Sequence, residues 1–511
     1  MDAFGNLLVG LQTALRPDHF FYCFSGVLLG TLLGVLPGIG PLAGIALLLP
    51  LTYHVDATSA IILLAGVYYG CQYGGSTTSI LMNVPGEISS VVTCLDGHQM
   101  ALNGRAGPAL GIAAFGSFIA GTAGTIGLML IAEPMTKIAL RFGPPEFFAL
   151  MALGIIVLTS ISRGSLVKGL IMAAAGFALS FIGIDPVAGR ERFTFGIIHL
   201  TSGLDLGPIA IGLFGVSEVL MNMEESAKLR IVGTASRIRG YLPSLKDWRD
   251  SIIPISRGTI LGFLVGIIPG GGVLLASFVS YAVEKRASKH PERFGTGTIE
   301  GVAAPESANN AASSSGFIPL FTLGIPSNVI MALLLGALMI HGAQPGPLFL
   351  AQHGDLFWGV VGSMYIGNLM LLILNLPLIP LWVQLLRIPP RILSPMILLF
   401  CIVGSYSVNN NILDVLVMAI AGLAGYVLRK RQYDVAPLCL AFVLAPIMEN
   451  SFRQSLIISN GTFAVFVTRP IAAAVLSIAL LLLVYSGIRR RPVAGSQDRM
   501  NIEHRTSNVE G

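Results

Sequence analysis

The chain has 511 residues, of which 54% are hydrophobic and only 11% charged, whereas a soluble globular protein carries roughly 25% charged residues. The mean hydropathy of +0.78 excludes a soluble enzyme, and it excludes a disordered chain because disorder needs low hydrophobicity and high charge. The net charge of +5 does not indicate a nucleic-acid partner: no lysine or arginine occurs between positions 17 and 104, and these residues gather mostly between apolar blocks, as in cytoplasmic loops of membrane proteins.

A short apolar run opens the chain at Phe4–Leu15. Asp2 rather than a basic residue precedes this run, and no A-x-A cleavage pattern follows it. Both features argue against a removable signal peptide. We therefore predict an interfacial helix over residues 1–16.

Long stretches without Asp, Glu, Lys or Arg follow, including 19–55, 57–86, 307–354 and 356–386. Since about 20 apolar residues are needed to cross the hydrocarbon core, the pattern predicts about 10–14 membrane segments. The expected fold class is an all-α polytopic membrane protein. The five cysteines are scattered and form no C-x-x-C pair, and the eight histidines are dispersed, so neither a disulfide framework nor a metal site is predicted.

Several short motifs occur twice and in the same order. Gly34-Val-Leu-Pro-Gly-Ile-Gly40 returns 232 residues later as Gly266-Ile-Ile-Pro-Gly-Gly-Gly272, and a Ser/Thr-rich stretch followed by an X-Pro pair also recurs. Such repetition predicts a duplicated transporter fold. The predicted organisation is an N-terminal helix (1–16), a first transmembrane repeat (17–223), a basic cytoplasmic linker (224–257), a second repeat (258–450), a terminal transmembrane helix region (451–488) and a cytoplasmic tail (489–511).

The charge pattern predicts that the two repeats are inverted. The linker 224–257 holds seven Lys or Arg residues against four acids, and the tail begins with three arginines, so both are expected in the cytoplasm. The first repeat then ends inside and the second outside. Lys285 and Arg286 would lie outside if 258–283 simply crossed the membrane, whereas a re-entrant hairpin broken at the Pro-Gly run would return them to the cytoplasm.

Breaks inside apolar blocks are the first candidate binding elements. Pro37–Gly40 and Pro269–Gly272 interrupt helices and leave backbone groups that hydrocarbon cannot satisfy, so this backbone must line protein or a cavity. Helices that start after the breaks would direct free N–H groups toward an anionic ligand. The alternative is a glycine-rich kink that serves close helix packing.

Polar runs near the breaks are the second candidate element. Gln72–Ser79 and Ser307–Gly316 supply hydroxyls and amides suited to carboxylates or to Na⁺, although Ser/Thr-mediated helix packing is the alternative reading. Glu306 is the first candidate for a proton or cation site, because an acid at membrane depth is costly. The alternative for Glu306 is an acid at a helix start after Pro305. Glu218 and Glu449, at the ends of the repeats, are expected to be structural.

No G-x-x-x-x-G-K-[ST] loop and no G-x-S-x-G elbow is present, so the sequence predicts neither ATP hydrolysis by this chain nor a hydrolase. Three rival readings are left open. An ATP-driven importer subunit would use the 224–257 linker as a coupling segment for an ATPase. An anion channel would not accumulate solute, and a membrane-embedded enzyme would turn over substrate without a gradient.

The chain resembles the large membrane subunit of tripartite tricarboxylate transporters, the TctA family, over roughly residues 15–490. The resemblance is carried by the duplicated glycine runs and by the motifs Tyr69–Ser79, Asn83–Glu87, Asp96-Gly-His98, Pro305–Ala311 and Thr322–Ser327. The resemblance implies a bacterial inner-membrane permease that works with a small four-helix membrane subunit and a periplasmic solute-binding protein. Such a secondary transporter imports carboxylates such as citrate by alternating access, without a cofactor, in symport with Na⁺ or H⁺.

The resemblance also implies which residues line the cavity, and Ser313 and Ser314 join them from the polar run. The candidate substrate-binding residues are Gly38, Gly40, Gly74, Gly75, Ser76, Thr77, Thr78, Ser79, Asn83, Pro85, Gly270, Gly271, Gly272, Asn309, Asn310, Ser313, Ser314, Gly324, Pro326 and Ser327. The candidate ion-coupling residues are Glu306 and Glu87. The second repeat has Ser327-Asn328 where the first has Gly86-Glu87, so only one half supplies an acid there.

Overall fold

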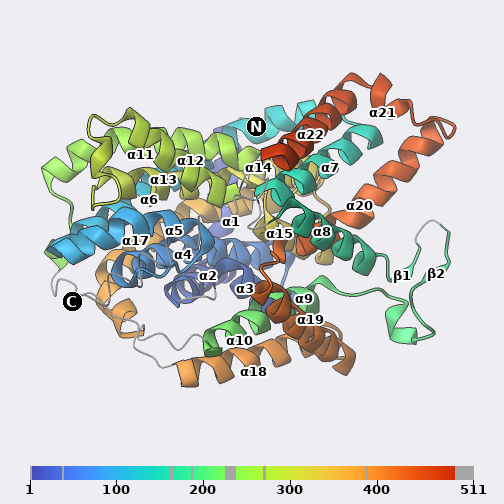
Figure 1. The fold of residues 1–511 in the computed structure, drawn as a ribbon, viewed down its shortest axis with the longest axis horizontal. Coiled ribbons are helices and arrows are strands. Elements are labelled where there is room, and N and C mark those ends of the chain that lie inside the picture. The colour runs from blue at the N-terminus through green and yellow to red at the C-terminus, as the bar shows by residue number, and fades with distance from the viewer. Residues whose placement is uncertain are drawn as a thin grey trace.

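The computed structural model describes residues 3–36, 40–161, 165–185, 188–224, 238–268, 272–385 and 390–489, which are mostly helical (Figure 1). The N-terminal helices are α1 (Ala3–Ala14), α2 (Pro17–Val35), α3 (Gly40–Leu48), α4 (Ala57–Met82), α5 (Val91–Thr93), α6 (Ala106–Ala139), α7 (Pro144–Ile161), α8 (Leu166–Ser180), α9 (Leu206–Ala210) and α10 (Ser217–Glu224). A small antiparallel ribbon, β1 (Gly183–Ile184) and β2 (Glu191–Arg192), follows α8.

The C-terminal part is also helical. Its helices are α11 (Leu245–Ile267), α12 (Gly272–Ala287), α13 (Glu300–Ser315), α14 (Phe317–Leu323), α15 (Val329–Ile340), α16 (Phe349–Gln352), α17 (Gly354–Leu385), α18 (Pro390–Asn409), α19 (Ile412–Lys430), α20 (Ala436–Ile458), α21 (Val465–Thr468) and α22 (Pro470–Arg489). Since α11 begins at Leu245, residues 245–257 of the predicted linker belong to a helix.

Among the described residues, five helices are long and apolar enough to cross a membrane: Pro17–Val35, Ala101–Ala139, Leu245–Ile267, Gly354–Leu385 and Ile412–Lys430. Shorter apolar helices such as α8 and α15 lie between them. The predicted fold class, an all-α polytopic membrane protein, is confirmed. The total of about 10–14 segments stays a prediction.

Glycines bring α2 directly against α4. Gly26 lies on the backbone of Leu63, and Gly30, one turn later, lies on the backbone of Val67. The contact positions advance together along both helices, so α2 and α4 run parallel, and α3 belongs to the segment that returns the chain between them. A stripe of small residues permits this close approach in a membrane, where no hydrophobic effect drives helices together.

The pair α11 and α13 repeats this arrangement. Gly258 lies on the backbone of Ala304 and Gly262 on that of Ala308, so these helices are also parallel. The helix α12 returns between them and packs on both. Arg257 of α11 and Glu284 of α12 form an ion pair at 3.1 Å, which places the end of α12 back beside the middle of α11. Lys285 and Arg286 therefore lie on the side of the molecule from which α11 starts.

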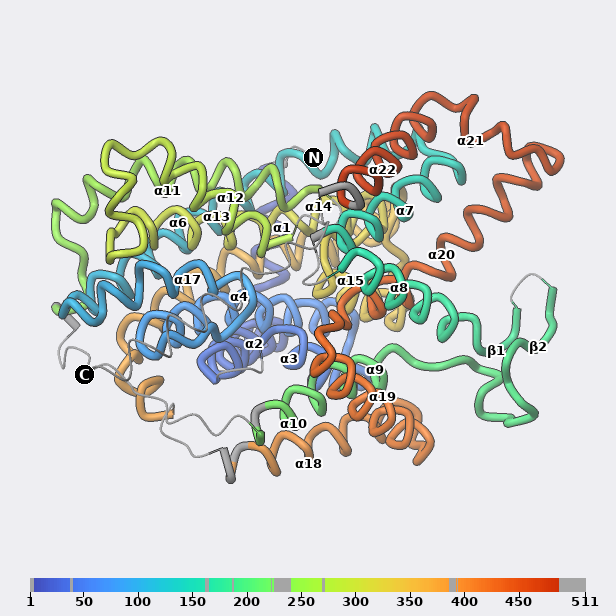
Figure 2. The backbone as a smooth tube through the Cα atoms, viewed as in Figure 1, coloured from blue at the N-terminus to red at the C-terminus, as the bar shows by residue number. Residues whose placement is uncertain are grey.

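The long helices α6 and α17 cross the middle of the bundle in opposite directions. Gly116 lies near Ser307, and Gly124 near Ala311, so α6 runs parallel to α13. The Cys23 thiol donates to the Ser363 carbonyl, and Gly367 lies near Val27, so α17 runs parallel to α2. Both helices also pack against α4. From the start of α4 to its end, the facing residues of α17 rise in residue number and those of α6 fall, so α17 runs parallel to α4 and α6 antiparallel. The helices α2, α4 and α17 thus oppose α6, α11 and α13 (Figure 2).

Several charged side chains outside this bundle form ion pairs. Glu449 of α20 contacts Arg192 at 3.0 Å and Arg453 at 2.6 Å, and Arg453 also contacts Asp185 beside the β1–β2 ribbon. Glu218 is paired with Arg429. Glu449 thus joins α20 to the ribbon, and Glu218 joins α10 to α19 (Figure 1).

The α2–α4 contact leads to the first prediction. A Cβ atom added to Gly30 would lie 2.5 Å from the Val67 carbonyl oxygen, so Gly30→Leu must push two backbones apart. We expect a loss of about 1–3 kcal/mol in stability, as overpacking costs in other cores, measured as a lower melting temperature of the purified protein. Gly354→Ala is the control, because nothing lies within 4 Å of its added Cβ. Equal melting temperatures for both variants would contradict the packing assigned to α2.

Candidate functional site

A layer of buried polar side chains lies where α4, α6, α13 and α17 meet. The helix α4 contributes Tyr73 and Ser76, α6 contributes Ser117, α13 contributes Asn310 and α17 contributes Asn368, and all are buried. These residues come from segments separated by up to about 300 positions in the sequence, so the layer exists only in the folded protein. Such groups cannot face lipid without a hydrogen-bond partner, and the surrounding helices supply the partners.

Glu306 lies in the polar layer and is fully buried on α13. One carboxylate oxygen, Oε2, lies 2.7 Å from the Ser76 hydroxyl and 3.4 Å from the Asn309 amide nitrogen, and Oε1 contacts the Thr93 hydroxyl. None of these partners carries positive charge. Since α13 begins at Glu300, Glu306 is inside the helix rather than at its start. Glu306 is therefore not an acid at a helix start after Pro305, which was the alternative that the sequence left open.

Glu87 has a different environment. It precedes a short 3-10 helix (Ile88–Ser90) and accepts hydrogen bonds from the Ser89 amide at 2.9 Å and from the Ser89 hydroxyl, as a capping residue does. Asn328, which the predicted sequence repeat aligns with Glu87, caps α15 by accepting from the Met331 amide at 2.9 Å. Both are capping residues, which explains how an acid and an amide can replace each other there.

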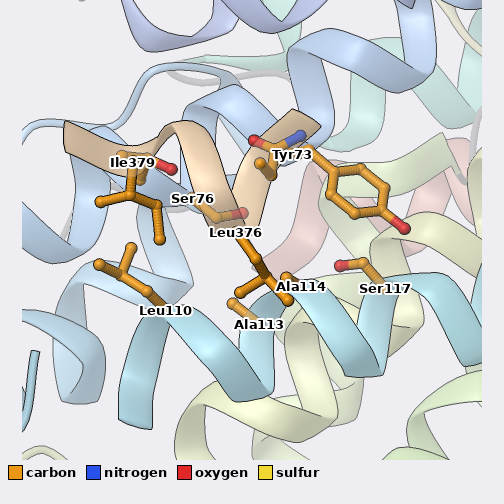
Figure 3. A pocket seen from close by; sticks show the side chains of 10 residues that line it. Tyr73, Ser76, Leu110, Ala113, Ala114, Ser117, Leu376 and Ile379 are labelled. Carbon is orange, nitrogen blue, oxygen red and sulfur yellow. The ribbon is translucent and has the colours of Figure 1, made fainter. Parts of the chain in front are cut away.

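Two narrow cavities open into the polar layer. The first is lined by Tyr73, Ser76, Thr77 and Ser117 together with apolar residues of α6 and α17 (Figure 3). The second is lined by Asn310, Ser313, Ser314 and Asn368, with Tyr69, Gly121, Thr125 and Met364. Each has room for little more than a water molecule, so neither holds an organic anion in this conformation.

Several predicted site residues line these cavities or contact their walls. Ser76 and Thr77 line the first, while Ser313 and Ser314 line the second. The Asn310 amide nitrogen lies 2.8 Å from the Ser117 hydroxyl and 2.5 Å from the Asn309 side-chain oxygen, which links α13 to α6. Asn309 also contacts Glu306, so both asparagines of the predicted pair lie in the polar layer.

Other predicted residues serve the backbone instead. Gly74 lies against Thr31 of α2, and Thr78 donates to the carbonyl of Val35 at 2.6 Å, near the end of that helix. Ser79 donates to the Ser90 hydroxyl at 2.9 Å. The polar run on α4 is therefore helical up to Met82, and only part of it faces the cavities.

The remaining predicted residues lie at chain reversals. Gly40 and Gly272 begin α3 and α12 with φ of 61° and 56°, while Asn83 and Gly324 end α4 and α14 with φ of 57° and 67°. Asn83 is exposed, whereas Gly75 packs on Glu87. Pro85 and Pro326 follow the reversals, and the buried Ser327 hydroxyl makes no hydrogen bond. Gly38, Gly270 and Gly271 lie outside the described residues.

Comparison with known proteins identifies the family. The model of the tripartite tricarboxylate transporter TctA family matches residues 20–440. The chain belongs to this family. TctA-family proteins are the large membrane subunits of tripartite tricarboxylate transporters and are permeases, not enzymes. The family match thus confirms the resemblance found in the sequence.

Two similar proteins come from Agrobacterium vitis. An uncharacterized 52.8 kDa protein in the TAR-I ttuC' 3' region is 51% identical over 484 residues, which cover 95% of this chain and 96% of that protein. An uncharacterized protein in the TAR-II ttuC' 3' region is 53% identical over 223 residues, covering 44% of this chain and 92% of that protein. No solved structure matches this TctA-family subunit.

Sequence reasoning missed two polar residues of the permease. Asn368 lies in the apolar stretch 356–386, as does Asn375, which lines the first cavity. Two asparagines in a stretch without charged residues were the sequence signal for these positions. Asp96 belongs to the motif Asp96-Gly-His98, to which the sequence assigned no role. It accepts from the amides of Gly297 at 2.9 Å and Thr298 at 3.0 Å and from the Tyr281 hydroxyl at 2.8 Å, and so fixes the loop before α13.

The contacts of Asn368 lead to the second prediction. Its Oδ1 accepts from the Tyr73 hydroxyl at 2.8 Å, and its amide nitrogen donates to Phe118 O and Thr122 Oγ1, both at 2.9 Å. Asn368→Ala and Tyr73→Phe should each destabilise the TctA-family subunit. Their double mutant should show a coupling energy of about 1 kcal/mol, because both variants remove the same hydrogen bond.

The cycle is measured by chemical or thermal unfolding of the purified protein. Asn375→Ala combined with Tyr73→Phe is the matched control, since the Asn375 amide nitrogen donates within its own helix, to Leu371 O. Strictly additive effects for Asn368 and Tyr73 would show that the contact between α4 and α17 contributes nothing.

Proposed function

We propose that this chain is the large permease subunit of a binding-protein-dependent secondary transporter in the bacterial inner membrane. It imports tricarboxylates or related organic anions by alternating access, driven by a Na⁺ or proton gradient. One observation carries the proposal beyond family membership: a closed polar layer, built from helices of both parts of the chain, contains a buried carboxylate without a cationic partner.

Two inverted repeats, 17–223 and 258–450, are part of this proposal. The glycine contacts support them: Gly26 and Gly30 of α2 correspond to Gly258 and Gly262 of α11, each 232 positions later. Opposite directions of α6 and α17, the matching long helices of the two repeats, support inversion. In alternating access, one repeat moves against the other around a central site.

The chemistry of the layer favours an anion that arrives with cations. Hydroxyls and amide N–H groups donate to carboxylate oxygens, but the residues lining the two cavities include no Lys, Arg or His. Each negative charge moved inward against the membrane potential costs about 2.3 kcal/mol per 100 mV. Co-transported cations offset this cost, and the buried carboxylate of Glu306 is a site at which one can bind.

The partners of the transporter follow from the family. We propose that a periplasmic solute-binding protein delivers the anion and that a small four-helix membrane subunit packs against the permease within the bilayer. Apolar helix faces are available for such packing: Leu399 and Phe400 of α18 and Leu480 and Leu481 of α22 are all more than half exposed. Lipid covers the faces that no subunit covers.

The deciding experiment is uptake of labelled carboxylates into proteoliposomes that hold this chain, the small subunit and the binding protein. Accumulation under an imposed Na⁺ or proton gradient supports the proposal and identifies substrate and ion. Equilibration without accumulation would instead indicate a channel. Uptake that needs ATP and an added ATPase subunit would overturn secondary transport.

The third prediction concerns residues of the polar layer. Ser76→Leu and Asn310→Leu each replace a hydrogen-bonding group with an apolar side chain, so uptake should fall at least tenfold while membrane insertion is retained. Ser407→Leu is the matched control, because Ser407 on α18 likewise donates to its own helix, at Val403 O, but lies outside the layer. Uptake at the control level in both layer variants would contradict the site.

A further inference from the structure

Glu306 presents a charge problem within the polar layer. Its carboxyl group is fully buried, and its partners Ser76, Thr93 and Asn309 are all neutral. An ionised carboxylate in such a place is strongly disfavoured unless it is paired. Glu146, by contrast, is buried beside Arg469 at 3.2 Å.

We propose that Glu306 is the proton-binding residue of the transport cycle and that its protonated carboxyl joins α13 to α4, through Ser76, in the closed state. This inference rests on the proposed function and names the coupling ion of that same site. The reaction is a simple protonation, in which the Glu306 carboxylate takes up one H⁺ to become a neutral acid and later releases it on the other side.

The hydrogen atoms around Ser76 can be counted. Its hydroxyl oxygen lies 2.7 Å from Glu306 Oε2 and 3.1 Å from the carbonyl oxygen of Gln72. A serine hydroxyl has one hydrogen to donate, and a carbonyl oxygen only accepts. Both contacts are full hydrogen bonds if Glu306 is protonated: Glu306 donates to Ser76, and Ser76 donates to Gln72. If Glu306 is ionised, the single hydrogen of Ser76 has to serve both the Glu306 carboxylate and the Gln72 carbonyl.

The other partners of Glu306 are compatible with the neutral acid. The Thr93 hydroxyl donates to Oε1, which is the carbonyl oxygen of the protonated group. The Asn309 amide at 3.4 Å is the most distant partner, as expected where Oε2 carries the hydrogen. All polar atoms of the group are then satisfied without a counter-ion.

The distance between Ser76 and Glu306 is that of a direct hydrogen bond. The two oxygens here are 2.7 Å apart, which is the usual separation for O–H···O. The contact between α4 and α13 is therefore closed by a hydrogen atom.

The titratable groups around Glu306 are few. Glu87 ahead of α5, Tyr73 of α4 and Cys94 after α5 are near enough to sense its charge. Ser117 lies nearby on α6, while Ser277 and Ser280 of α12 donate to carbonyls of α13 one and two residues before Glu306. The face of α11 against α13 is formed by glycines. No described cation is therefore positioned to hold Glu306 ionised.

Loss of the proton changes the contact between the two repeats. Ionised Glu306 brings an unpaired negative charge into a layer that also has to accept an anionic substrate and holds Glu87 nearby. Protonation removes that repulsion, so anion binding and proton binding favour each other. Proton and substrate therefore bind together once the helices around the layer have moved apart, which couples the two fluxes.

Infrared difference spectroscopy tests protonation without any transport. In the purified permease, the carbonyl stretch of a buried carboxylic acid should be present at neutral pH, lose one component in Glu306→Gln and keep that component in Glu87→Gln and Glu146→Gln. Glu146→Gln is the matched control, because its carboxylate is buried but paired with Arg469. An unchanged band in Glu306→Gln would overturn the proposal, whatever the uptake measurements show.

Uptake by the complete three-component system provides the second test. A gradient of one pH unit supports about tenfold accumulation for each proton coupled. Glu306→Gln, which cannot take up or release a proton, should lose accumulation driven by the proton gradient, whereas Glu146→Gln should retain it. If wild-type protein accumulates substrate under a Na⁺ gradient alone, Glu306 is not a proton site although the protein is a transporter. If wild type transports nothing under any gradient, the proposed function itself fails.

Discussion

The fold depends on keeping a layer of polar side chains away from lipid. Hydrocarbon offers no hydrogen-bond partners, so hydroxyls and amides at membrane depth must find them within the protein. Glycine stripes on α2 and α11 make this possible, because they let α4 and α13 pack with their backbones nearly in contact. The residues that face away from the glycines, such as Ser76 and Asn310, then meet one another instead of lipid.

The directions of the helices explain why the layer is central. The helices α4 and α13 run in opposite directions and meet where Ser76 of α4 contacts Glu306 of α13, so their polar positions coincide there. The helices α6 and α17 cover the same level from either side, and Asn368 joins three of the four helices by hydrogen bonds. Charged residues elsewhere, such as Glu449 and Arg453, form ion pairs with each other. No Lys or Arg lines either cavity of the polar layer.

The sequence predicted the membrane class and the polar runs, because each depends on neighbouring residues. It also identified Glu306, since one acid in a long apolar region is a local signal. It could not place Asn368, whose partners are on α4 and α6, or tell that Thr78 serves the backbone of α2. Those roles are set by contacts between segments hundreds of positions apart, which no local pattern records.

The two kinds of contact in the bundle differ in what they allow. Glycine-to-backbone packing joins α2 with α4 and α11 with α13 over several turns, so each pair is expected to move as a rigid unit. Between the units, α4 meets α13 through a few polar contacts, of which Ser76 with Glu306 is the most direct. The cavities near that contact are too small for an organic anion, so the proposed transport cycle needs movement between the units. A contact made by one hydrogen bond breaks at small cost, whereas separating a glycine seam loses close packing over several turns of two helices.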